Sequence, residues 1–176
     1  MLRPCPRRSS LPTEIRRIDY GTPAAATLLD EMDVEMGALY SDARETQNPA
    51  MAKLVGIALT VHPDEIVAAV GAFDSALDTD ELVGHAALRP FEDALEVKRV
   101  YVRSDHRGQG ISKQLMLELE AIARERGVTS LILQTGNRQD EAIALYEKIG
   151  YVQIDRFGAY EPVPFFLCFG KELSTP

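Results

Sequence analysis

The residues best suited to chemistry lie in a polar loop of the chain, residues 103–112. Its core reads Arg107-Gly108-Gln109-Gly110, and it stands between an apolar segment that ends at Val102 and an amphipathic helical pattern. The first N–H groups of a helix have no partner within it, and the helix dipole adds partial positive charge there. Glycines lack a Cβ, so a bulky anion can touch the backbone. The loop therefore predicts a phosphate or pyrophosphate site with Arg107 at its rim.

The same two glycines have a purely structural interpretation, because glycine is common in turns and at helix ends. Two better-known nucleotide motifs are missing from the sequence. The three-glycine dinucleotide fingerprint is not met, and neither is the phosphate-binding loop that ends in Gly-Lys-Ser/Thr. Hydride transfer with a nicotinamide nucleotide and phosphoryl transfer are therefore disfavoured.

A second motif, Leu145-Tyr146-Glu147-Lys148-Ile149-Gly150-Tyr151, closes the next helical pattern. Together the two motifs resemble the GNAT superfamily of acetyl-CoA-dependent N-acetyltransferases. Arg107, Gly110 and Ser112 match the Arg/Gln-x-x-Gly-x-Gly/Ala signature of that family, with serine in place of the last small residue. Serine keeps its backbone N–H, so we expect the phosphate cradle to survive. The resemblance is dense over about residues 82–151, and residues 1–60 share only the order of elements.

The resemblance implies acetyl-CoA as the co-substrate and no metal. It places the pantetheine arm along the backbone of one strand and the pyrophosphate on the N–H groups of the glycine loop. Many family members also have an asparagine three residues before the position of Ala142; this chain has Gln139 there, and Asn137 lies nearby as the alternative. The implied cofactor-binding residues are Val100, Tyr101, Val102, Arg107, Gly108, Gln109, Gly110, Ile111, Ser112, Asn137 and Gln139.

The resemblance also implies direct attack of an amine on the thioester in a ternary complex. Tyr146 occupies the family position of the general acid that protonates the leaving thiolate; its alternative is a core tyrosine on an apolar helix face. A backbone N–H near Val102 would stabilise the oxyanion. Glu96 is the candidate base, acting directly or through water, and its alternative is a solvated carboxylate at a strand end.

Two adjacent cations, Lys98 and Arg99, are unusual inside a strand. Strict alternation predicts that one face carries Glu96, Lys98, Val100 and Val102. The cations would either pair with Glu96 or bind an acidic group of the substrate, which would favour an amino acid or a peptide terminus as acceptor. In the family fold, Tyr40 and Tyr160 would border the substrate cleft.

The surrounding pattern predicts the elements that position these residues. Apolar runs predict strands over residues 14–20, 66–73, 82–88, 95–102, 129–134, 151–154 and 165–169. Helical spacing predicts helices near residues 23–41, 51–58, 111–126 and 142–149. The resulting class is a mixed α/β (α+β) fold, in which strands 66–73, 82–88 and 95–102 form an antiparallel meander. The family resemblance specifies a mostly antiparallel sheet of about six to seven strands and about four helices, with a splayed parallel pair ending near Val102 and Gln134.

Composition limits the alternatives. The chain has 176 residues, of which 45% are hydrophobic and 26% charged, which fits one domain at residues 14–176 after a Pro/Arg-rich arm at residues 1–13. A net charge of −8 disfavours nucleic acid and anionic lipid as partners. No apolar run reaches membrane-spanning length. Cys5 and Cys168 form no disulfide framework or metal-ligand spacing, so we expect a reducing cytoplasm.

We therefore expect an N-acetyltransferase whose partners are acetyl-CoA and a primary amine. Two alternatives stay open: a protein or peptide N-terminal acetyltransferase, and a non-catalytic acyl-CoA sensor of the same fold. His85 is expected as a core histidine. A homodimer is compatible with the sequence but not specified by it.

Overall fold

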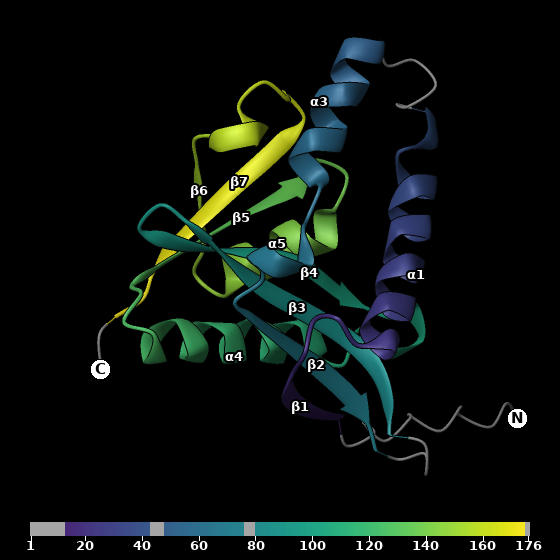
Figure 1. The fold of residues 1–176 in the computed structure, drawn as a ribbon, viewed down its shortest axis with the longest axis vertical. Coiled ribbons are helices and arrows are strands. Elements are labelled where there is room, and N and C mark those ends of the chain that lie inside the picture. Colours follow the sequence, from purple (N-terminus) through teal and green to yellow (C-terminus); the bar gives the residue numbers. More distant parts are fainter. Residues whose placement is uncertain (1–12, 43–47, 76–79, 175–176) are drawn as a thin grey trace, which may run out of the picture.

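A seven-stranded mixed sheet organises the part of the chain that the computed structural model describes, residues 13–42, 48–75 and 80–174 (Figure 1). The strand order is β1-β2-β3-β4-β5-β7-β6, and of these neighbouring pairs the β4–β5 pair alone is parallel. The expected fold class is confirmed. The strands are β1 (Thr13–Ile18), β2 (Ala68–Asp74), β3 (Glu81–Phe91), β4 (Ala94–Val102), β5 (Ser130–Gly136), β6 (Val152–Ile154) and β7 (Phe166–Glu172).

Four helices accompany the sheet in the described residues: α1 (Pro23–Leu39), α3 (Pro49–Leu59), α4 (Ile111–Glu125) and α5 (Asp140–Lys148). Three 3-10 turns complete the structure: η1 (Pro63–Glu65), η2 (Ser104–His106) and η3 (Gly158–Tyr160). The predicted start of α1 is confirmed, since the side chain of Thr22 accepts a hydrogen bond from the N–H of Ala25. The predicted arm, residues 1–13, lies outside the described residues except for Thr13, which already belongs to β1.

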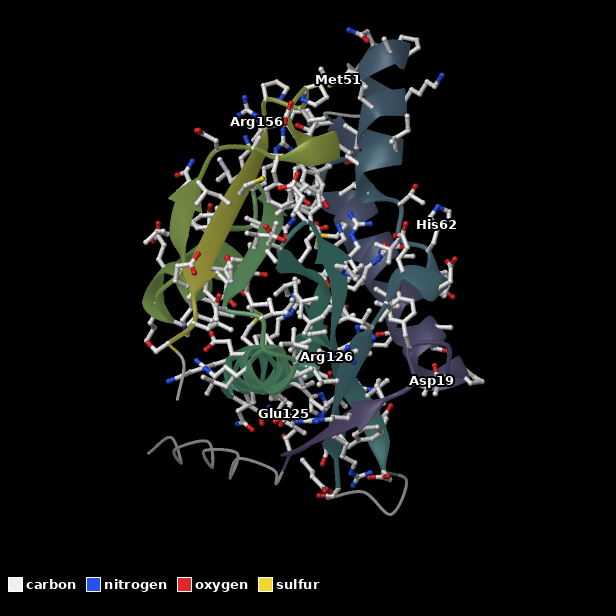
Figure 2. The ribbon with its side chains drawn as sticks, turned by 60° about the vertical axis from the view of Figure 1, so that its left-hand side comes forward. Asp19, Met51, His62, Glu125, Arg126 and Arg156 are labelled. Carbon is white, nitrogen blue, oxygen red and sulfur yellow. The ribbon has the colours of Figure 1, made fainter. Side chains whose placement is uncertain are left out.

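Each face of the sheet is covered by its own helices. The largest core lies under α4, where Leu115 and Leu119 pack against sheet residues such as Val97. On the other face, Leu28 and Met32 of α1 pack against Tyr101. In both views α4 and α1 lie apart with strands between them (Figures 1 and 2). Burial of these apolar side chains is the main force that joins helices to sheet.

The C-terminal end of α4 is fastened to the first strands by polar contacts. Glu125 and Arg126 project from this end of the helix (Figure 2). Arg17 of β1 pairs with Glu125 at 2.7 Å and with Glu118 at 2.9 Å. Arg126 donates to the carbonyl oxygen of Val67 at 2.7 Å. Because α4 carries the glycine loop at its other end, these contacts help to orient the loop.

A bulge in β4 breaks the alternation that the sequence predicts. Ala87 of β3 faces Lys98, but His85 faces Tyr101, so Ala86 lies opposite two residues of β4. Arg99 has a φ of +56°, which a side-chain-bearing residue rarely adopts. Its carbonyl oxygen lies 3.1 Å from Nδ1 of the fully buried His85. The bulge thus has a specific side-chain partner on the neighbouring strand.

The extra residue reverses the side-chain phase beyond Arg99. Val97, Val100 and Val102 all pack against the core under α4. Lys98 instead contacts Tyr160, outside that core. The expectation that one face carries Glu96, Lys98, Val100 and Val102 is therefore wrong, because strict alternation assumes a regular strand.

The parallel pair separates at the same place. Registered pairing between β4 and β5 runs from Leu95↔Leu131 to Val97↔Leu133. Beyond it, β4 continues to Val102 against β3, while β5 continues to Gly136 against β7. The splayed pair expected from the family resemblance is confirmed, and its gap opens where the bulge begins.

Candidate functional site

A cavity of about 630 Å³ lies against the end of β4, in the part of that strand that no longer pairs with β5. Its walls come from α1, the end of β4, the glycine loop and the starts of α4 and α5. Tyr146 also lines it. Asn137 and Gln109, both predicted to bind cofactor, are not part of this lining. The remaining predicted cofactor-binding residues do line the cavity: Val100, Tyr101, Val102, Arg107, Gly108, Gly110, Ile111, Ser112 and Gln139.

The glycine loop has the backbone geometry of an anion cradle. Gly108 and Gly110 have φ values of +74° and +79°. A Cβ placed on either would meet nothing within 4 Å, so conformation rather than crowding requires glycine here. Gly110 caps α4 without a side-chain hydrogen bond, and the first helical residues line the cavity. Unpaired N–H groups and the positive end of the helix dipole therefore meet at open space.

His106 lies beneath this loop and lines the cavity. Its Nε2 is 3.1 Å from Oδ2 of the buried Asp74, and its Nδ1 is 2.7 Å from Oδ1 of Asp105. Burial by itself lowers the pKa of His106, but the hydrogen bonds to Asp105 and Asp74 outweigh it, and the pKa is raised above its ordinary value. Sequence reasoning missed His106, because its buried partner lies on β2, far along the chain.

Arg107 joins the loop to α1. Its Nε donates to the carbonyl oxygen of Val102 at 2.9 Å, and its Nη2 donates to Oε2 of Glu35 at 2.7 Å. The hydroxyl of Tyr101 donates to the same oxygen at 3.0 Å. The hydrogen bond from Arg107 is the main reason that the pKa of Glu35 is lowered. Glu35 belongs to no motif, and its only sequence signal is its place on a helix expected to border the cleft.

Tyr146 is both a core residue and a cavity residue. It is 5% exposed and its ring lies 6.0 Å from that of Tyr151 and 6.2 Å from that of Phe169, centroid to centroid. Burial raises the pKa of its hydroxyl above the ordinary tyrosine value. A phenol that stays protonated at neutral pH is in the form that a general acid requires.

Glu96 lies at the centre of a buried cluster with Arg89, Lys98 and Tyr160, here called the Glu96 cluster. Its Oε2 accepts from Nε of Arg89 at 2.7 Å, and its Oε1 accepts from the hydroxyl of Tyr160. Lys98 donates to the Tyr160 hydroxyl at 2.6 Å and lies 3.4 Å from Glu96 Oε1. Glu96 is fully buried, so the interpretation as a solvated carboxylate is wrong. None of these four residues lines the cavity.

The predicted substrate residues are distributed differently from the expectation. Lys98 pairs with Glu96, one of the two alternatives, and burial lowers the pKa of its amine. Arg99 donates to Asp33 of α1 at 2.6 Å. Tyr160 is 1% exposed within the Glu96 cluster.

Tyr40 lies just after α1 and beside the cavity rather than in its lining. Its hydroxyl accepts from the N–H of Arg138 at 3.2 Å. A Cβ on Gly136 would lie 2.0 Å from that hydroxyl, so any other residue there would have to displace the Tyr40 ring. Tyr40 thereby joins the end of α1 to the turn between β5 and α5.

Comparison with known proteins decides the family. The family description "Acetyltransferase (GNAT) family" matches residues 38–151, well over half of the chain. The chain belongs to the GNAT acetyltransferases. Among relatives of this GNAT chain, the "IAA acetyltransferase" of Azospirillum brasilense is 33% identical over 158 residues, covering 85% of this chain and 91% of the relative. The rat "N-acetyltransferase family 8 member 2" is 38% identical over 87 residues, covering 46% of this chain and 38% of the relative.

Solved structures show the same GNAT architecture. A crystal structure from Klebsiella pneumoniae, assigned to the acyl-CoA N-acyltransferases, has a TM-score of 0.71 at 29% identity, covering 92% of this chain and 98% of that one. The PaiA N-acetyltransferase of Thermoplasma acidophilum, solved with coenzyme A, has a TM-score of 0.64 at 19% identity and covers 92% of this chain and 99% of its own.

Among residues 13–42, 48–75 and 80–174, no group of three or more His, Cys, Asp or Glu side chains is placed so that it could hold a metal ion. Within the same residues, every helix is too short or too polar to span a bilayer.

Proposed function

We propose that this GNAT acetyltransferase transfers the acetyl group of acetyl-CoA to a primary amine by direct attack in a ternary complex. One observation carries the proposal: the glycine cradle, the free edge of β4 and Tyr146 all line one cavity. The cradle suits a pyrophosphate, the edge suits an extended amide-bearing arm, and the phenol suits a leaving thiolate. Relatives solved with coenzyme A or acetyl-CoA bound support the choice of cofactor.

Each part of the cofactor has a matching feature. The pyrophosphate would rest on the N–H groups of the glycine loop, and the pantetheine arm would pair with the backbone of residues 98–102, which β5 leaves unpaired. Gln139 lines the cavity and Asn137 does not, which favours Gln139 for the amide contact. Backbone N–H groups of β4 at the gap would stabilise the oxyanion of the tetrahedral intermediate.

Two proton transfers complete the reaction. The amine nitrogen bonds to the thioester carbon, the C–S bond breaks, and the thiolate takes the proton of the Tyr146 hydroxyl. The extra proton on the nitrogen of the tetrahedral intermediate leaves to a base, so that the product is a neutral amide. Glu96 stays the predicted base; because neither it nor its partners line the cavity, water would have to carry the proton from the cavity to the Glu96 cluster. Exchange of Glu96 for glutamine keeps the shape and removes the basicity, so a base role predicts a large fall in kcat with little change in CoA affinity.

The acceptor substrate and the cellular location of the reaction are predictions. The Azospirillum relative is named as an acetyltransferase of IAA, and the rat relative is named as an N-acetyltransferase. For this chain we propose a small amine, an amino acid or a peptide amine, acted on in the cytoplasm. A protein N-terminal acetyltransferase and a non-catalytic acyl-CoA sensor are the alternatives.

A screen of amines tests the proposal. The full chain is incubated with acetyl-CoA and a panel of amines, amino acids and peptides, and thiol release and acetylated products are measured by absorbance and mass spectrometry. Acetylation of an amine nitrogen supports the proposed reaction. Tight binding of CoA without turnover on any member would instead support the sensor, and failure to bind CoA would refute both.

A further inference from the structure

Glu35 is the one carboxylate of α1 that lines the cavity in the described residues. Its Oε2 holds Arg107 of the glycine loop and the hydroxyl of Tyr101. Elsewhere α1 meets the sheet mainly through apolar side chains. A helix outside both motifs is thus linked, through a single carboxylate oxygen, to the residue that begins the anion cradle.

This link opposes the binding of an anion. A pyrophosphate that settles on the cradle meets a guanidinium whose charge is already neutralised by Glu35. The pair can exchange partners, because the side chains of Arg107 and Glu35 are 34% and 35% exposed and such pairs are weak in water. A pyrophosphate offers Arg107 more negative charge and several oxygens in a geometry that a guanidinium matches. Arg107 would stay tethered meanwhile by its hydrogen bond to the Val102 carbonyl oxygen.

We propose that acetyl-CoA draws Arg107 from Glu35 to the pyrophosphate, and that the released Glu35 carboxylate binds the ammonium group of the acceptor. The ammonium nitrogen then loses one proton to the base before it attacks the thioester, since only the neutral amine has a free electron pair. This proposal rests on the proposed acetyltransferase function. The acceptor is then a cationic amine, and it binds more tightly after acetyl-CoA, since in the free protein it would compete with Arg107 for Glu35. The Tyr101 hydroxyl keeps the carboxylate oriented during the exchange.

The first step is tested by calorimetric titration of the full chain with CoA. We expect Glu35→Gln to bind CoA about five-fold more tightly, the affinity equivalent of an exposed ion pair that no longer has to be broken. Glu31→Gln is the matched control, because Glu31 is exposed one turn earlier on α1 and does not line the cavity. In an Arg107→Ala background, Glu35→Gln should leave the affinity for CoA unchanged. Pantetheine, which lacks the pyrophosphate, should bind the wild-type protein and the Glu35→Gln variant with equal affinity.

The second step is tested with an amine that gives turnover. We expect Glu35→Gln to raise the KM of that amine at least ten-fold, with a smaller change in kcat, and Glu31→Gln to change neither. CoA affinity that is unchanged or weaker in Glu35→Gln would overturn the exchange, and an unchanged KM would overturn the role in acceptor binding. If the wild-type chain does not bind CoA at all, the proposed function fails instead.

Discussion

Removal of the Glu96 carboxylate should reveal how strongly the buried charges beside the splay depend on one another. Glu96 is fully buried, and it faces Arg89 and Lys98, whose side chains are 17% and 7% exposed. Arg89 has a second carboxylate, Glu65, at 3.1 Å. For Lys98, Glu96 is the only ion-pair partner among the described residues. Glu96→Ala therefore leaves one buried amine without compensation.

The size of the effect follows from this asymmetry. Removing one partner of a buried ion pair costs about 3–5 kcal/mol, because the remaining charge stays in a medium of low dielectric constant. Glu65 compensates part of the loss at Arg89, so we expect Glu96→Ala to lower the free energy of unfolding by about 3 kcal/mol at neutral pH. Burial already lowers the pKa of Lys98, and without Glu96 to oppose it the pKa falls further.

The lower pKa of Lys98 makes the stability of the Glu96→Ala variant depend on pH. The unfolded chain then binds the lysine proton more readily than the folded variant, so the stability of the variant rises with pH until the ordinary lysine pKa of about 10.4 is passed. The difference in the free energy of unfolding between the variant and wild type should therefore become smaller as the pH is raised above neutrality.

Urea unfolding followed by far-ultraviolet circular dichroism measures the effect, since the chain has no tryptophan. Glu96→Ala combined with Lys98→Met removes both charges and should recover most of the lost stability. A single variant within about 1 kcal/mol of wild type, or a double variant as unstable as the single, would refute this account of the Glu96 cluster.

Three other expectations concern the cavity. Tyr146→Phe should leave CoA affinity unchanged and lower kcat about 100-fold or more, and kcat close to wild type would remove the acid role. Gly110→Ala and its control Gly127→Ala, which share a positive φ and open surroundings, should each lose about 1–2 kcal/mol of stability. Only Gly110→Ala should also weaken CoA binding in a titration, so equal affinities would contradict the cradle. The raised pKa of His106 keeps its imidazole charged up to a higher pH than usual, so both CoA affinity and the stability from its contact with Asp74 should fall as pH rises through that pKa. His106→Gln should flatten the pH dependence of CoA affinity, and an unchanged profile would rule out a charge at His106.

The sequence predicted well whatever depends on neighbouring residues. The start of α1 at Thr22-Pro23 and the glycine loop before α4 follow from capping and backbone freedom, which act over a few residues. The bounds of the strands were less accurate. The strand predicted over residues 82–88 in fact continues to Phe91, and a two-residue turn leads from it to β4. β3 extends beyond its apolar run because it pairs with β4 as far as Phe91. The residue pattern of one strand carries no information about the strand that will pair with it.

The charged residues of β4 show the limit of this reasoning. Alternation placed Glu96 and Lys98 on the same face as Val100 and Val102, but the bulge at Arg99 reverses the phase. The bulge has a partner in His85, on a strand that comes before it in the chain. A pattern read along one strand cannot include a hydrogen bond from another.

The sequence by itself determined the fold class, the glycine loop before α4 and the position of Tyr146 in the next helix, because local backbone chemistry and two spaced motifs specify them. The tertiary structure alone decided which charges meet. Glu35 reaches Arg107, Asp74 reaches His106 and Tyr160 reaches Glu96 across separations of 72, 32 and 64 residues. Such pairs form because packing brings distant segments within hydrogen-bond distance, and burial then makes each charge depend on the partner it finds.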